Sequence, residues 1–137
     1  MLVLCTGNSC RSQMAEAYIR FFGGNDWDVF SAGVEAHGLN QRMLQVMKED
    51  GISMEGHYSK TVDAFEGKSF DVVWTVCGHA REVCPWFPAE AELFHHGFTD
   101  PAAATGSEEE ILAVFRSVRD EIKAFAARWV EEKRSPQ

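Results

Sequence analysis

Hydrophobic and polar positions along the chain follow patterns typical of strands and helices. Residues 1–4 form a short apolar run, which is typical of a buried strand. Between residues 12 and 21 the apolar positions return at helical spacing, and this face holds Met14, Ala17, Tyr18 and Phe21. Gly23 and Gly24 follow and are expected to end the helix. The chain is therefore predicted to begin as strand, loop and helix.

The alternation of strands and helices continues along the chain. Further strands are predicted at residues 27–31, 70–76 and 92–95, and further helices at residues 39–49 and 62–65. The run 70–76 is nearly continuous in apolar and β-branched residues, as in a central parallel strand that is buried on both faces. The helix at 39–49 is expected to turn three residues inward, Met43, Val46 and Met47.

The last helix has the clearest pattern in the sequence. Ser107 and Glu110 have the spacing of a capping box, and acidic residues fill the first turn. Apolar residues then recur in steps of four and three, which predicts one continuous buried stripe: Ile111, Phe115, Val118, Ile122, Phe125 and Trp129.

Strands that alternate with helices indicate parallel βαβ units with right-handed crossovers. We therefore predict one three-layer α/β domain over residues 1–137, with a four-stranded parallel sheet and helices on both faces. Ligands bind at the carboxyl ends of the strands in such sheets. Cys5, Cys77 and Asp100 each follow a predicted strand, so we expect them to share one edge of the sheet.

Composition narrows the possible functions. A net charge of −8 argues against binding to nucleic acid or to an acidic membrane surface, and implies that an anionic substrate is attracted by a local site. No apolar run reaches membrane-spanning length and no basic leader precedes a long apolar core, so we expect a cytoplasmic protein. We also expect a monomer. Four cysteines in that compartment favour catalytic, redox or metal-binding roles. Their spacings contain no C-x-x-C pair, so no metal or other cofactor is expected.

The loop between the first strand and the first helix carries the candidate chemistry. Its backbone N–H groups and the helix dipole would hold a tetrahedral oxyanion, in a loop formed by Thr6, Gly7, Asn8, Ser9, Cys10 and Arg11. The Arg11 guanidinium would bind two oxygens of that anion. Cys5 would then be a thiolate nucleophile beneath the anion, since amides, dipole and guanidinium all favour its charged form.

Other residues near this loop have expected supporting roles. Asp100, held on a loop by Pro101, is the candidate acid for the departing oxygen. Ser12 is expected to donate its hydroxyl to the Cys5 thiolate or to cap the helix. Asn8 is a candidate strut that holds the loop in a left-handed turn. Cys10 has no derived role other than that of a small filler inside the loop.

The stretch CTGNSCRSQMAE resembles the N-terminal signature of the low-molecular-weight phosphatase fold, and more narrowly that of thioredoxin-coupled arsenate reductases. The resemblance extends to residues 31–33, 97–101 and 118–122 and to the thiols Cys77 and Cys84. It implies arsenate as the substrate, thioredoxin as the reductant, and Asp100 as the acid. It also implies a relay in which Cys77 attacks Cys5 to release arsenite, and Cys84 then attacks Cys77 to leave a disulfide for thioredoxin.

Two alternatives to arsenate reduction stay open. The first is a protein tyrosine phosphatase, which has no use for two further thiols. Ala102 argues against it, because it stands where the resembling phosphatases carry an aromatic residue. The second is a redox or arsenite-sensing protein without turnover. The five histidines are expected to be solvated or packed, although His79 and Arg81 are candidates to assist the thiolates of Cys77 or Cys84.

One departure from the family pattern concerns a cation. One branch of the resembling reductases binds potassium near the loop, and Asn8, Glu16 and Ser31 match that site. Tyr58 and Lys60 stand where that branch has a small hydroxyl residue and a carboxylate. We therefore expect the Lys60 ammonium to replace the ion and to pair with Glu16.

Overall fold

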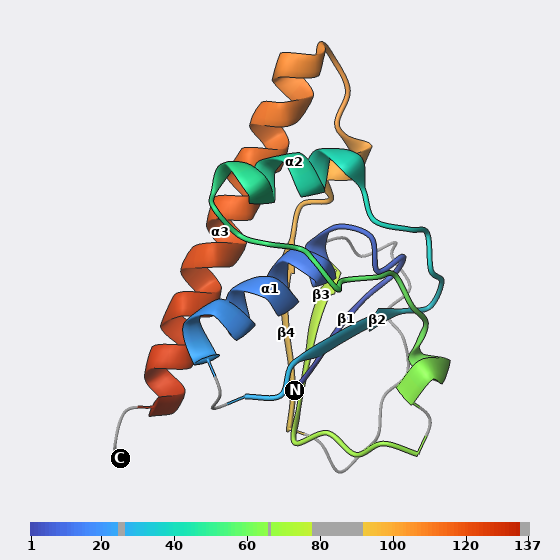
Figure 1. The fold of residues 1–137 in the computed structure, drawn as a ribbon, viewed down its shortest axis with the longest axis vertical. Helices are drawn as coiled ribbons and strands as arrows, with labels where there is room; N and C mark the ends of the chain where they lie inside the picture. Colours follow the sequence, from blue (N-terminus) through green and yellow to red (C-terminus); the bar gives the residue numbers. More distant parts are fainter. Residues whose placement is uncertain (25–26, 66, 78–91, 135–137) are drawn as a thin grey trace.

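The computed structural model describes residues 1–24, 27–65, 67–77 and 92–134, and shows a sheet covered by helices (Figure 1). The strands are β1 (Leu2–Cys5), β2 (Phe30–Gly33), β3 (Val72–Cys77) and β4 (Glu92–Phe98). The α-helices are α1 (Arg11–Gly23), α2 (Gln41–Glu49) and α3 (Glu108–Arg134), and two short 3-10 helices are η2 (Val62–Phe65) and η3 (Pro101–Ala103). The domain is therefore α/β, as predicted.

The four strands form one parallel sheet in the order β2-β1-β3-β4. β1 and β3 are the two central strands, and Val3 of β1 lies opposite Trp74 of β3. Because all strands are parallel, their carboxyl ends lie at one edge of the sheet. Cys5 and Cys77 are the last residues of the two central strands, and Asp100 follows β4 by two residues. The prediction that these three positions share an edge is confirmed for the backbone.

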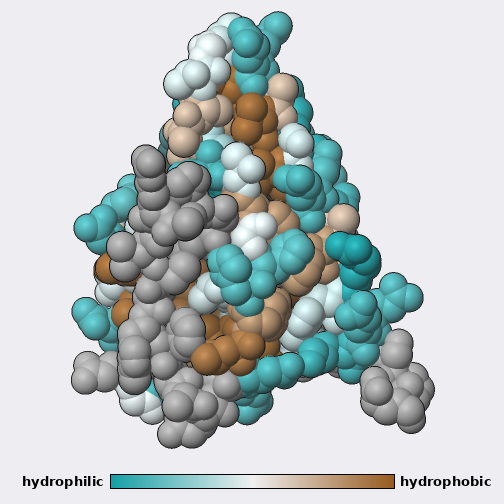
Figure 2. Space-filling model, turned by 180° about the vertical axis from the view of Figure 1, so that it is seen from behind, coloured by the Kyte–Doolittle hydropathy of each residue, from teal (hydrophilic) through white to brown (hydrophobic). Residues whose placement is uncertain are grey.

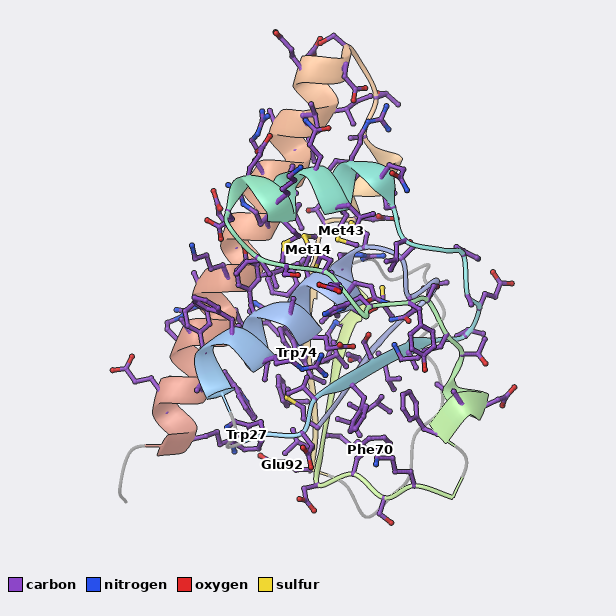
Figure 3. The ribbon with its side chains drawn as sticks, viewed as in Figure 1. Met14, Trp27, Met43, Phe70, Trp74 and Glu92 are labelled. Carbon is purple, nitrogen blue, oxygen red and sulfur yellow. The ribbon has the colours of Figure 1, made fainter. Side chains whose placement is uncertain are left out.

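The larger hydrophobic core lies between the sheet and the three α-helices. It holds side chains from one face of β1 and β3 and the apolar stripes of α1, α2 and α3. Met14, Met43 and Trp74, labelled in Figure 3, are completely buried in it. The Trp74 ring stacks on Phe94 and lies 4.8 Å from the ring of Phe125 in α3. These contacts join the last helix to the edge strand β4.

A smaller core lies on the opposite face of the sheet. Leu2, Leu4 and Val73 point to that side, where Phe70 and the η2 residue Phe65 pack on them. Among the described residues, the short helix η2 covers this face of the sheet. The helical layer on this side is therefore much smaller than the layer formed by α1, α2 and α3. Figure 2 shows the molecule from behind, where hydrophobic residues gather in patches near the middle of the view and hydrophilic residues lie to their right.

Several boundaries and one buried position differ from the sequence-based expectations. β2 begins at Phe30, three residues later than predicted, and β4 extends to Phe98. Phe21 was expected on the buried face of α1, but it is 61% exposed. Phe22 packs against the core in its place and stacks on Tyr18. In the described part of the chain, no helix is both long and apolar enough to cross a membrane.

Candidate active site

The loop from Thr6 to Cys10, between β1 and α1, turns its carbonyl groups outward. Each of the five carbonyl oxygens accepts a hydrogen bond from a group outside the loop or further along α1. The Thr6 and Gly7 carbonyls accept from the N–H groups of Glu35 and His37. The Asn8 carbonyl accepts from the side-chain amide of Gln13. The Ser9 and Cys10 carbonyls accept from the N–H groups of Asn40 and Met14. Ser59 Oγ adds a second bond to the Gly7 carbonyl at 3.2 Å.

This carbonyl pattern determines where the loop amides point. The chain has no cis peptide bond, and in a trans peptide the N–H of one residue points opposite to the carbonyl of the residue before it. The N–H groups of residues 7–11 therefore point away from those partners. A pocket of about 350 Å³ is lined by Cys5, Thr6, Gly7, Asn8, Ser9, Cys10, Arg11, His37, Asp100 and Ala102. Backbone N–H groups that point away from those partners at the start of a helix are suited to bind an oxyanion, which makes this pocket the candidate site.

The two thiols of the loop differ in chemistry. Both Cys5 and Cys10 are buried and reduced. Burial, together with the charge of Asp100, raises the pKa of Cys10 to about 12, against the opposing effect of Arg11. Cys10 is therefore a neutral thiol at physiological pH. Cys5, at the end of β1 and in the pocket lining, is the nucleophile candidate of the two.

Arg11 and Asp100 meet at the pocket from two different elements. Arg11 is the first residue of α1 and is 4% exposed, and its Nη1 donates to the Phe98 carbonyl at 3.1 Å. Its Nη2 lies 3.6 Å from Oδ2 of Asp100. The other carboxylate oxygen of Asp100 accepts from the Ala102 N–H at 3.0 Å, which caps η3. The guanidinium is thus held beside the acid candidate.

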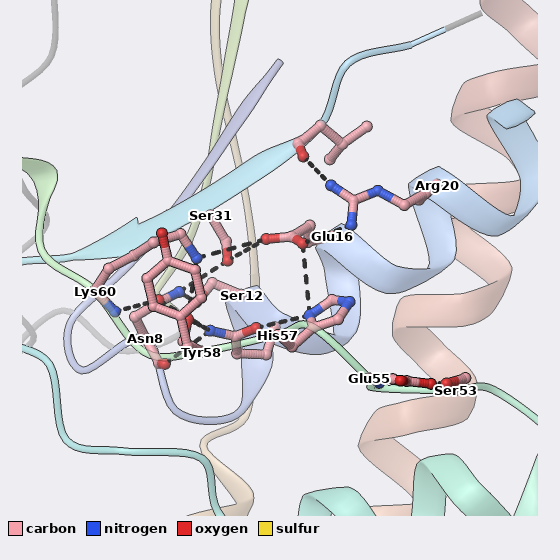
Figure 4. Close-up of polar contacts among 12 residues, drawn as sticks. Asn8, Ser12, Glu16, Arg20, Ser31, Ser53, Glu55, His57, Tyr58 and Lys60 are labelled. Carbon is pink, nitrogen blue, oxygen red and sulfur yellow. Dashed lines mark hydrogen bonds and ion pairs between the residues drawn. The ribbon is translucent and has the colours of Figure 1, made fainter. Parts of the chain in front are cut away.

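Asn8 anchors the loop from beneath (Figure 4). It is completely buried and, with a φ of 48°, it is the one non-glycine residue in the described ranges that adopts the left-handed conformation. Its Nδ2 donates to Ser12 Oγ at 2.9 Å and to Ser31 Oγ at 3.0 Å. Its Oδ1 accepts from Gln13 Nε2 and from the Lys60 N–H, both at 2.9 Å. These contacts fit the strut role expected of Asn8.

A buried carboxylate extends this network. Glu16, on α1 and 5% exposed, accepts a 2.6 Å hydrogen bond from Ser31 Oγ. Three basic groups surround its two oxygens: Arg20 Nη1 at 3.2 Å, His57 Nδ1 at 3.5 Å and Lys60 Nζ at 3.9 Å (Figure 4). Burial lowers the pKa values of both His57 and Lys60, and the charge of Glu16 opposes that effect.

The structure corrects or extends several expectations about single residues. Helix α1 has Cys10 and not Ser12 as its N-cap residue, and Ser12 lies in the first turn, where its hydroxyl accepts from Asn8. Cys77 closes β3, whereas Cys84, His79 and Arg81 lie outside the described residues.

Three polar residues of the site escaped the sequence analysis. His57, Gln13 and His37 come together with the loop through tertiary contacts, and their local sequence patterns carry no such signal. Nowhere in residues 1–24, 27–65, 67–77 and 92–134 do three or more His, Cys, Asp or Glu side chains form a candidate metal site.

Comparison with known proteins agrees with this geometry. The model of the low molecular weight phosphotyrosine protein phosphatase family matches residues 1–135. The chain belongs to this family. Among its relatives, an arsenate reductase from Halalkalibacterium halodurans is 54% identical over 127 residues, which cover 90% of this chain and 91% of the relative.

Solved structures of arsenate reductases share the fold. The arsenate reductase from Archaeoglobus fulgidus has a TM-score of 0.79 at 26% identity, covering 95% of this chain and 98% of that one. An arsenate reductase in a phosphate-binding state has a TM-score of 0.74 at 28% identity, covering 96% of this chain and 95% of that one. The four-stranded parallel sheet is therefore the fold of the family.

Proposed function

We propose that this chain is a thioredoxin-coupled arsenate reductase. Arsenate binds in the Cys5–Arg11 loop, where the amides of residues 7–11 and the Arg11 guanidinium neutralise its charge. The Cys5 thiolate attacks arsenic and forms an S–As bond. Asp100 protonates the departing oxygen, which leaves as water. The relative solved in a phosphate-binding state supports the choice of a tetrahedral oxyanion.

The second half of the reaction is a disulfide relay. The Cys77 thiolate attacks the Cys5 sulfur, so that the S–As bond breaks and its electron pair stays with arsenic, which is reduced from As(V) to As(III) and leaves as arsenite. The Cys84 thiolate then attacks the Cys77 sulfur and releases Cys5 as a thiolate. The resulting Cys77–Cys84 disulfide is reduced by the dithiol of thioredoxin, which supplies the two electrons of each cycle.

The observation that carries the reductase proposal is the placement of Cys77. β1 and β3 are paired neighbours with Leu4 opposite Thr75, and Cys5 and Cys77 are the last residues of these two strands. Neighbouring strands are about 4.8 Å apart. A second cysteine thus lies on the strand next to the nucleophile, at the same edge of the sheet, which a phosphatase mechanism does not require.

The test is arsenate-dependent oxidation of NADPH with thioredoxin and thioredoxin reductase, for the wild type, Cys77→Ser and Cys84→Ser. We expect steady turnover in the wild type and no turnover beyond one cycle in either variant. Cys10→Ser is the matched cysteine variant: Cys10 lines the pocket but its thiol has no part in the relay, so turnover should continue beyond one cycle whatever its rate. Turnover in Cys84→Ser equal to that of the wild type would contradict the relay.

Phosphatase activity is the second candidate, favoured by the family itself. Against aryl phosphates as the main substrates, Ala102 lines the pocket and offers no aromatic wall for a phosphotyrosine ring. We expect slow hydrolysis of an aryl phosphate at most. Fast hydrolysis without arsenate turnover would make the chain a phosphatase. Tight arsenite binding without either activity would instead favour a sensor.

We also propose that Lys60 takes the place of a bound cation beside Glu16. Its side chain is 10% exposed, its Nζ lies 3.9 Å from Glu16 Oε1, and it donates to the Tyr58 carbonyl at 3.0 Å. An ammonium group in this position leaves a potassium ion no vacant carboxylate, so the residues here do not fit a resident ion. Turnover is expected to be equal in potassium and sodium buffers. A several-fold rise with potassium would contradict this role.

A further inference from the structure

His37 lies at the mouth of the oxyanion pocket, a position that no local sequence pattern predicts. It belongs to the segment after β2 and lines the pocket together with the loop and Asp100. Its backbone N–H donates to the Gly7 carbonyl at 3.0 Å, and the neighbouring Glu35 N–H donates to the Thr6 carbonyl, also at 3.0 Å. The position of His37 is therefore fixed by the loop that holds the anion.

The imidazole is oriented by a carboxylate and by the loop. Its Nε2 lies 2.5 Å from Oε2 of Glu35. Its Nδ1 is turned toward Gly7, since a Cβ atom built on Gly7 would lie only 2.4 Å from Nδ1. Glycine at position 7 thus gives the ring room to approach the backbone of the loop. A carboxylate that accepts from one imidazole nitrogen fixes both the tautomer and the orientation of the ring.

We propose that His37, oriented by Glu35, is a substrate-contacting residue that binds an outer oxygen of the oxyanion through Nδ1. The carboxylate of Glu35 only accepts hydrogen bonds, so Nε2 carries a proton and Nδ1 is left for the pocket. A protonated ring donates from Nδ1 to a bare oxygen. A neutral ring accepts the hydroxyl proton of a singly protonated oxyanion. Both forms contribute a hydrogen bond to the bound anion.

The charges around the pocket explain why a hydrogen bond from His37 would increase affinity for the anion. Arg11 is the guanidinium of the pocket, but it is already close to the Asp100 carboxylate, at 3.6 Å. The net charge of the chain is −8, so the molecule as a whole repels a dianion. A second polar group at the mouth therefore adds to affinity. This inference rests on the proposed function only in naming arsenate as the anion.

The test measures binding of inorganic phosphate to the reduced full-length protein by titration calorimetry. We compare His37→Ala, His37→Phe, His37→Asn and Glu35→Gln with the wild type. Phenylalanine fills the same wall without a ring nitrogen, whereas asparagine places a polar atom near the position of Nδ1. We expect phosphate to bind about 5- to 20-fold more weakly to the Ala and Phe variants, and His37→Asn to recover most of the affinity.

Controls separate this contact from general effects. Glu55→Gln removes one exposed carboxylate outside the pocket and should leave phosphate affinity unchanged, whereas Glu35→Gln should weaken it about twofold or more. Urea unfolding of each variant reports whether it is folded. Phosphate affinity of His37→Phe equal to that of the wild type would overturn the proposal. If the wild type binds phosphate but does not reduce arsenate, the proposed function fails while the His37 contact stands.

Discussion

At the scale of single residues, Asn8 shows why the loop holds its shape. Its side-chain amide uses both donor positions and accepts two hydrogen bonds, all inside the protein. Its φ of 48° lies in the region that asparagine tolerates better than most residues. Asn8 therefore adopts the left-handed backbone conformation and also supplies four side-chain hydrogen bonds. A substitution that keeps the size of the side chain but removes its donors tests the hydrogen bonds alone.

Asn8→Asp is such a change. The carboxylate keeps the two acceptor contacts but cannot donate to Ser12 or Ser31, and it places a charge in a fully buried position near Glu16. We expect the free energy of unfolding to fall by about 2–4 kcal/mol and arsenate turnover to be largely lost. Urea denaturation and steady-state kinetics measure the two effects.

Asn40→Asp is the matched control for this change. Asn40 caps α2, and its Oδ1 accepts from the N–H groups of Arg42 and Met43 without donating to them. Aspartate is as good an N-cap as asparagine, so stability should change by less than about 0.5 kcal/mol. Equal losses in both variants would show that the donor contacts of Asn8 are unimportant.

Cys10 offers a second test at this scale, through its pKa of about 12. In a Cys77→Ser/Cys84→Ser background, iodoacetamide at pH 7.5 should modify Cys5 quickly and leave Cys10 unmodified. Because the thiolate is the reactive form, the rate at Cys10 should rise about tenfold per pH unit as pH increases toward that pKa. Mass spectrometry of digested protein reads both sites. Rapid modification of Cys10 at neutral pH would contradict its assignment as a neutral thiol.

At this scale, sequence reasoning succeeded where the residues are close along the chain. The loop and the left-handed Asn8 both follow from one contiguous motif between a strand and a helix. His37 and His57 join the site only through folding, because each is brought to the loop from a segment with weak local patterns. The N-cap role of Ser12 was wrong because the helix begins one residue earlier than predicted.

At the scale of elements, Asp50 connects the three α-helices at one point. It follows α2, accepts a 2.6 Å hydrogen bond from Tyr18 of α1, and lies 2.9 Å from Lys123 Nζ of α3. Burial opposes ionisation of Asp50, but the hydrogen bonds from Tyr18 and Lys123 outweigh it, so its pKa lies below the usual value. Burial and the bond to Asp50 raise the pKa of Tyr18.

Tyr18→Phe should therefore lower the free energy of unfolding by about 1–2 kcal/mol at pH 7, because a hydrogen bond to a charged group is lost. The sign of the pH effect follows from the depressed pKa of Asp50. Its contribution to stability is present above the unfolded pKa of about 4 and is lost as pH falls through the folded value. Urea unfolding measured from pH 7 to pH 3 should thus show that the difference in free energy of unfolding between wild type and Tyr18→Phe becomes smaller toward pH 3.

The ion pair between Glu49 and Arg116 provides a comparison for the contacts of Asp50. It also joins α2 to α3, but its two side chains are 36% and 42% exposed. Exposed pairs contribute about 0–1 kcal/mol, so Arg116→Ala should cost less than Tyr18→Phe. The reverse order would mean that burial of Tyr18 does not determine the strength of its hydrogen bond to Asp50.

Element patterns predicted the helices better than the strands. The stripe of α3 and the capping box of Ser107 and Glu110 are confirmed, because periodicity over many turns leaves little ambiguity. Phe21 was placed on the wrong face because Phe22 follows it directly, and either aromatic fits a short helix pattern. The start of β2 depends on pairing of Leu2 with Phe30, which no local pattern reveals.

At the scale of the whole molecule, the charge balance sets how the substrate reaches the pocket. The chain carries a net charge of −8, while the pocket itself gathers amides, Arg11 and His37. In the proposed function, the local site therefore has to attract a dianion against a repulsive long-range field. Salt distinguishes the two contributions, since screening acts over about 30 Å at 0.01 M but over about 10 Å at 0.1 M.

We expect kcat/KM for arsenate to stay constant or to rise by up to about twofold when ionic strength increases from 0.01 to 0.1 M. Screening weakens the long-range repulsion first, whereas the contacts within the pocket are short and change little. The measurement uses two sodium salts with anions of different size, so that competition for the pocket is recognised by its dependence on the anion. A fall of tenfold with both salts would show that the long-range field attracts arsenate, and the local site would then not be the main source of affinity.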